Sequence, residues 1–79
     1  MAIKVSLKSH HGMIHVIEHT LERTFTNVTD EEIRPNPEER PDHRETLATI
    51  TIDDPTATVE NVTESLRRFF DKGFILSIT

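Results

Sequence analysis

The hydrophobic pattern changes its period along the chain, and this change limits the fold more than any other feature. Residues 3–7 alternate apolar and polar side chains, which predicts a strand with one buried face. From Met13 to Phe25 the apolar residues recur at steps of three and four, which is typical of an amphipathic helix. Residues 47–52 are rich in β-branched side chains and predict another strand.

Two further strands and one further helix complete the pattern. Residues 25–33 predict a short edge strand, although three consecutive acidic residues weaken its strand preference. A second amphipathic helix is predicted to begin after Thr58, which is suited to cap it, and to end before Gly73. The inward residues of the last strand are predicted from their alternation to be Phe74, Leu76 and Ile78.

The order strand–helix–strand–strand–helix–strand has one common solution, the ferredoxin-like sandwich. In this α+β fold, two right-handed crossovers place both helices on one face of a four-stranded antiparallel sheet. Because 79 residues are too few for two domains, residues 1–79 are predicted to form one such domain. Residues 34–45 contain three prolines among charged residues and predict an exposed loop between the two middle strands.

Charge and apolar content exclude two classes of partner. The net charge is −5 at pH 7 and the nine Lys and Arg residues are scattered, which argues against nucleic-acid binding. No apolar run approaches the roughly 20 residues of a membrane helix, and the first residues lack the apolar core of a signal peptide. We therefore expect a cytoplasmic protein without a membrane partner. A short chain without cysteine has a thin, uncrosslinked core, which favours a homo-oligomer such as a dimer.

The sequence predicts no enzymatic activity and no catalytic residues. The chain has no cysteine or tyrosine, and its serines lie outside the nucleophile-elbow pattern. Ser9 precedes His10, but adjacent side chains rarely point together, and serine at such a turn usually caps a helix. The acidic run at residues 30–32 is interpreted as solvated charge, because it lacks the spacing of a calcium-binding loop.

Residues 5–14, with the sequence VSLKSHHGMI, resemble the opening of an ACT domain, in which a strand runs into an Asp-x-x-Gly-x-Leu turn. Gly12 matches the glycine of that turn, whereas Ser9 stands where the family usually has aspartate. The resemblance continues at pattern level through residues 47–52 and 59–78. It implies a regulatory module that dimerises side by side and binds a small metabolite, often an amino acid, at this turn. The ligand-binding residues that it implies are Ser9, His10, His11, Gly12, Met13 and Ile14.

Three histidines recur at a four-residue spacing on the first predicted helix. His11, His15 and His19 therefore lie on one helical face, about opposite the apolar stripe, and Glu18 and Glu22 lie between them. Such a His-x-x-x-His pair together with a carboxylate can chelate Zn²⁺ or Ni²⁺. The competing interpretation is a solvated polar face that uses histidine without binding a metal.

Three functional hypotheses follow from these patterns. The first is an ACT-like module that binds an amino-acid-like effector or regulates a partner protein. The second is a protein-interaction or inhibitor protein, such as a phage-type host-interaction factor, that presents the acidic residues 30–45 to a basic partner. The third is a metal-binding protein that uses the histidines. No cofactor other than Zn²⁺ or Ni²⁺ is indicated.

Overall fold

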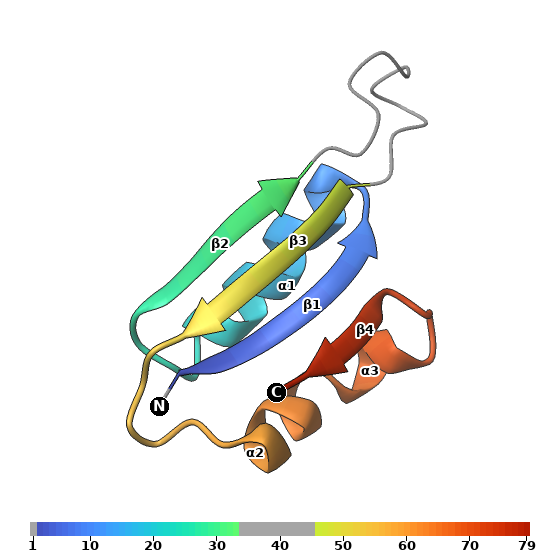
Figure 1. Ribbon diagram of the computed structural model, residues 1–79. Coiled ribbons are helices and arrows are strands. Elements are labelled where there is room, and N and C mark those ends of the chain that lie inside the picture. The colour runs from blue at the N-terminus through green and yellow to red at the C-terminus, as the bar shows by residue number, and fades with distance from the viewer. Residues whose placement is uncertain (1, 34–45) are drawn as a thin grey trace.

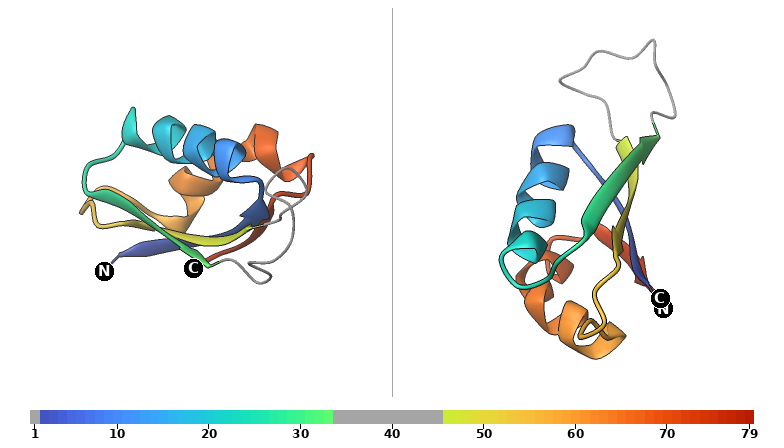
Figure 2. Two further views of the ribbon diagram at one scale, coloured as in Figure 1. Left: turned by 90° about the horizontal axis from the view of Figure 1, so that it is seen from above. Right: turned by 90° about the vertical axis from the view of Figure 1, so that its left-hand side faces the viewer.

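The computed structural model describes residues 2–33 and 46–79 of the chain (Figure 1). Its strands form one antiparallel sheet in the order β2-β3-β1-β4, and the helices cover the same face of that sheet (Figure 2). This confirms the predicted α+β class with a four-stranded antiparallel sheet. The elements are β1 (Ile3–Ser9), α1 (His11–Glu22), β2 (Val28–Ile33), β3 (Thr46–Ile52), α2 (Val59–Ser65), α3 (Arg67–Phe70) and β4 (Ile75–Ile78). The loop predicted at residues 34–45 lies outside the described residues.

The second predicted helix is divided into α2 and α3, so residues 2–33 and 46–79 contain three helices in place of the two expected. Thr58 caps α2 as predicted, because its hydroxyl accepts a hydrogen bond from the Asn61 main chain at 3.1 Å. The helix ends at Ser65, because the φ of −106° and ψ of 9° of the next residue, Leu66, are not helical. Just before it, the hydroxyls of Thr63 and Ser65 donate to main-chain carbonyls four residues earlier, an interaction that tends to bend helices.

The predicted alternation of the last strand is wrong at Leu76. Ser6 pairs with Ser77 and Leu7 pairs with Ile75, so Leu76 is an extra residue in β4. Such a β-bulge interrupts the alternation of side chains between the two faces. As a result Leu76 is 60% exposed, whereas Ile75 packs against the core.

The core lies between the helices and the covered face of the sheet. Alternate residues of the two central strands point into it, and α1 contributes one apolar stripe, as its period predicts. The buried apolar side chains of these three elements are Val5, Leu7, Ile14, Ile17, Leu21, Ala48, Ile50 and Ile52. The helical segments of the second half add Val62, Leu66 and Phe69. None of the helices in the described residues is long and apolar enough to cross a membrane.

Asp54, just after β3, connects two loops through one buried carboxylate. One of its oxygens accepts hydrogen bonds from the main chain and hydroxyl of Thr26 at 2.8 and 3.2 Å, and the other accepts the same pair from Thr56 at 2.8 and 2.7 Å. Hydrogen bonds from Thr56 and Thr26 lower the pKa of Asp54 to about 2. The carboxylate thus holds the loop after α1 against the turn before α2.

We expect Asp54→Asn to lower the urea midpoint of unfolding at pH 7, with an effect that fades in acid. The folded-state pKa of Asp54 lies below its ordinary value of 3.8, so the unfolded chain takes up the proton first. The stabilisation is therefore complete above about pH 4 and lost as the pH falls towards 2. Asp53→Asn, at the exposed neighbour, is the control. A difference between Asp54→Asn and wild type that persists unchanged at pH 2 would contradict this account.

Candidate functional site

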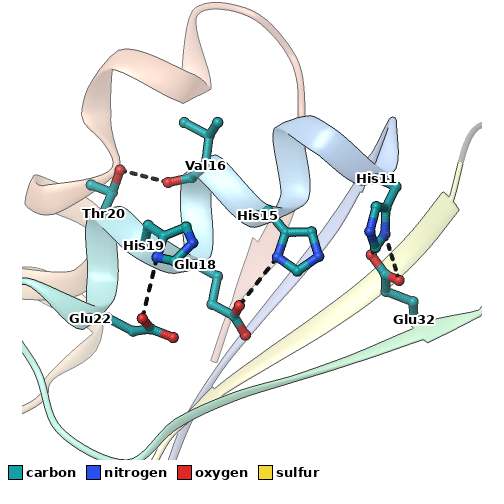
Figure 3. Close-up of polar contacts among 8 residues, drawn as sticks. All are labelled: His11, His15, Val16, Glu18, His19, Thr20, Glu22 and Glu32. Atoms are coloured by element: carbon teal, nitrogen blue, oxygen red, sulfur yellow. Dashed lines mark hydrogen bonds and ion pairs between the residues drawn. The ribbon is translucent and has the colours of Figure 1, made fainter.

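Helix α1 places its three histidines along the edge of the sheet formed by β2 (Figure 3). The Nδ1 atom of His11, at the start of the helix, lies 2.7 and 2.9 Å from the two carboxylate oxygens of Glu32. The rings of His11 and His15 are 4.3 Å apart between centroids and nearly perpendicular. One ligand atom each from His11, His15 and Glu32 can be chosen so that all three lie within 4.8 Å of one another.

His19, the third histidine of the predicted metal site, lies apart from this group. Its ring centroid is 6.4 Å from that of His15, and its Nδ1 atom lies 3.4 Å from an oxygen of Glu22. Among the described residues, the group with metal-ligand geometry contains His11 and His15 but not His19. The side chains of the three histidines are 58%, 44% and 69% exposed in chain order, in keeping with their predicted position opposite the apolar stripe.

Glu18, between the histidines in sequence, is buried against β2 and not solvated. Its Oε1 atom lies 3.6 Å from Nδ1 of His15, and its carboxyl group hydrogen-bonds Asp30. Burial, the hydrogen bond to Asp30 and the negative charges of Asp30, Glu22 and Glu32 raise the pKa of Glu18 to about 7.

The acidic residues of β2 were predicted to be solvated charge or a surface for a basic partner, and not to contact the histidines. Strand alternation contained the signal, because Asp30 and Glu32 fall two and four residues after Val28, a partly buried residue that packs on the core. The low exposure of Glu32, 18% for its side chain, follows from this inward position. The interpretation of the acidic run as uniformly solvated charge is therefore wrong at Glu32.

We expect Glu18→Gln to stabilise the metal-free protein increasingly between about pH 4.5 and 7. The folded-state pKa of Glu18 is above its ordinary value of 4.5, so wild-type protein loses stability as the unfolded chain ionises first. Glutamine does not ionise and avoids this loss, which is on the order of 1–3 kcal/mol above pH 7. Urea unfolding at several pH values measures the difference. Glu60→Gln, at an exposed position on α2, is the control, and parallel curves for Glu18→Gln and wild type would refute the expectation.

A cleft of about 350 Å³ lies where the β1–α1 turn meets the α3–β4 turn. The main-chain N–H of Lys8 donates to the carbonyl of Phe74 at 2.9 Å, which joins its two walls. Gly73 allows the chain to turn into β4, because its φ of 74° is strained for any residue with a Cβ. The residues that line the cleft are Lys8, Ser9, His10, Lys72, Gly73, Phe74 and Leu76.

The Ser9 hydroxyl is a buried polar group in the wall of this cleft. The residue is 5% exposed, and its oxygen has no hydrogen-bond partner within the part of the chain that the structure describes. Ser9 does not cap α1: the N-cap residue is His10, whose side chain makes no capping hydrogen bond. A buried hydroxyl without a partner costs about 1–3 kcal/mol, so a ligand group that reached this oxygen and formed a hydrogen bond with it would remove that cost.

The residues implied by the ACT resemblance are divided among several environments. Ser9 and His10 line the cleft, whereas His11 contacts Glu32 on the other side of the α1 N-terminus. Gly12 is exposed, with no atom close to the position of a Cβ. Met13 is partly buried and Ile14 is completely buried, so both serve the core. Lys72 lies 63 residues after Ser9 in the sequence, and no local pattern indicated that the two residues line the same cleft.

Comparison of the chain with protein-family models, with curated proteins and with solved structures found no match. The resemblance of residues 5–14 to an ACT domain therefore stays a prediction. Function is inferred from the side chains of the two sites themselves.

Proposed function

We propose that this chain is a ferredoxin-like, ACT-like regulatory module that binds a small carboxylate effector in the cleft beside Ser9. The observation that carries the proposal is the buried, unpartnered Ser9 hydroxyl in a cleft that two lysines also line. The strand order β2-β3-β1-β4, with all helices on one face, supports the ferredoxin-like part of the proposal. The module has no catalytic role in this proposal and acts by binding.

The chemistry of the cleft favours an anion. Lys8 and Lys72, both cationic residues, are among its lining residues, and a serine hydroxyl such as that of Ser9 can donate a hydrogen bond to a carboxylate oxygen. Helix α1 begins two residues after Ser9, at His11, and its first turn contains no acidic side chain, so its N-terminal main-chain N–H groups also favour negative charge. The volume of about 350 Å³ falls within the usual range for small-molecule sites.

The same lining narrows the class of effector. No acidic residue is found among the described residues of the cleft, so a ligand's ammonium group has no carboxylate partner there. Dicarboxylic amino acids and 2-oxo acids, which carry net negative charge, therefore fit better than neutral amino acids. This preference agrees with the serine at the position where ACT domains usually have aspartate.

We expect Ser9→Ala to weaken effector binding and to stabilise the free protein by about 1 kcal/mol. Removing the hydroxyl removes a binding group and, in the empty cleft, an unsatisfied buried donor. Calorimetric titration with aspartate, glutamate and 2-oxoglutarate measures the first effect, and urea unfolding measures the second. Lys72→Gln should also weaken binding, whereas Lys4→Gln, on the same strand as Lys8 but outside the cleft, should not.

Absence of binding by the wild-type protein across acidic amino acids and 2-oxo acids would contradict the proposed function. A loss of stability in Ser9→Ala would show that the hydroxyl has a structural partner and would remove the observation on which the proposal rests. Equal effects of Lys72→Gln and Lys4→Gln would place binding elsewhere.

The proposal includes a homodimer, because small domains with thin cores often gain stability from association. The exposed Leu76 supports a partner surface. It lies with Leu47 on the open face of the sheet, where Ser6 and Thr49 also line a shallow depression. Light scattering during size-exclusion chromatography measures the mass, and a monomer at all accessible concentrations would remove the dimer while leaving the cleft untouched.

A further inference from the structure

The geometry points to a second, independent site: an open divalent-metal site formed by His11, His15 and Glu32, which would take Zn²⁺ or a similar first-row cation. The two histidines come from successive turns of α1, and the carboxylate comes from the edge strand β2 (Figure 3). This site goes beyond the proposed effector cleft, with which it shares no residue.

The distances between the three side chains are close to those that a metal requires. In a tetrahedral zinc site with bonds of 2.0–2.2 Å, neighbouring ligand atoms are about 3.4 Å apart. Here the three ligand atoms lie within 4.8 Å of one another, and the His11 nitrogen is already 2.7 Å from a Glu32 oxygen. Small rotations of these partly exposed side chains therefore suffice to enclose a cation, and the main chain need not move.

The surroundings of the three residues favour a cation and orient one ligand. The Nδ1 atom of His15 lies 3.6 Å from Oε1 of Glu18, which leaves Nε2 of that ring for a metal. Glu18, Glu22 and Asp30 add carboxyl groups on the same side of the helix. Imidazole and carboxylate ligands in this number, with the outer positions open to water, suit Zn²⁺ and Ni²⁺ and not Mg²⁺ or Ca²⁺.

The histidine repeat supplies its own matched control. His19 occupies the same helical face and lies beside a glutamate, but its ring is 6.4 Å from that of His15 and contacts Glu22. If any nearby histidine could bind the metal without a defined geometry, His19 would bind it as readily as His11. In a site defined by His11, His15 and Glu32, His19 takes no part in binding.

The test is calorimetric titration of Zn²⁺ into chelator-treated protein, with Co²⁺ absorption as a report on the ligands. We expect one ion per chain and a loss of at least about tenfold in affinity in each of His11→Ala, His15→Ala and Glu32→Gln. The controls His19→Ala and Ser9→Ala should bind Zn²⁺ as wild type does. Circular dichroism of the metal-free variants verifies that each is folded.

Three results would overturn the inference: no Zn²⁺ binding by wild type, equal losses in His15→Ala and His19→Ala, or unchanged affinity in Glu32→Gln. Because Ser9→Ala leaves the metal ligands intact, failure of this site and failure of the effector cleft give different results. If the wild-type protein binds an effector but does not bind Zn²⁺, the metal site is rejected and the proposed function is unaffected.

Discussion

The packing of α1 on the sheet is the contact on which both candidate sites depend. Ile14, Ile17 and Leu21 are completely buried, and their stripe determines which sides of the helix face the sheet, its edge and solvent. Once that stripe is buried, the N-terminus of the helix must lie at the end of β1, beside the α3–β4 turn (Figure 1). The histidine side of the helix must then overhang β2. A helix rotated by one residue would separate His11 from Glu32.

Edge strand β2 differs from the central strands in its inward positions. Two of them carry acidic side chains, Asp30 and Glu32, which lie outside the hydrophobic core. Inward-pointing charges are one way in which proteins prevent edge strands from pairing with other molecules. Here that arrangement also concentrates carboxyl groups under α1, where Glu18 is buried and its pKa is raised to about 7. The Nδ1 atom of His11, on the facing helix, lies 2.7 Å from a carboxylate oxygen of Glu32 in this region. The same excess of negative charge favours a bound cation.

The cleft beside Ser9 arises from a different part of the fold, the meeting of two turns at one end of the sheet. The bulge in β4 contributes to it, because it turns Leu76 away from the core and towards the cleft and the open face. The two turns are joined by main-chain hydrogen bonding between β1 and Phe74 and lie far apart in sequence. The cleft exists only where the two turns meet.

The periodicity of the sequence by itself determined the class of the fold, the first helix and the buried faces of the central strands. Buried positions recur every two residues in strands and every 3.6 residues in helices, so they can be recognised from the local sequence. The helix break at Leu66 and the β-bulge at Leu76 depend on how neighbouring elements pack together. The hydrophobic periodicity of the sequence therefore predicts neither of them. The histidine spacing was visible, but only tertiary packing selected His11 and His15, excluded His19 and supplied Glu32. Likewise, Ser9 was visible, and only the folded chain brought Lys72 to it, because side-chain contacts between distant segments have no local signature.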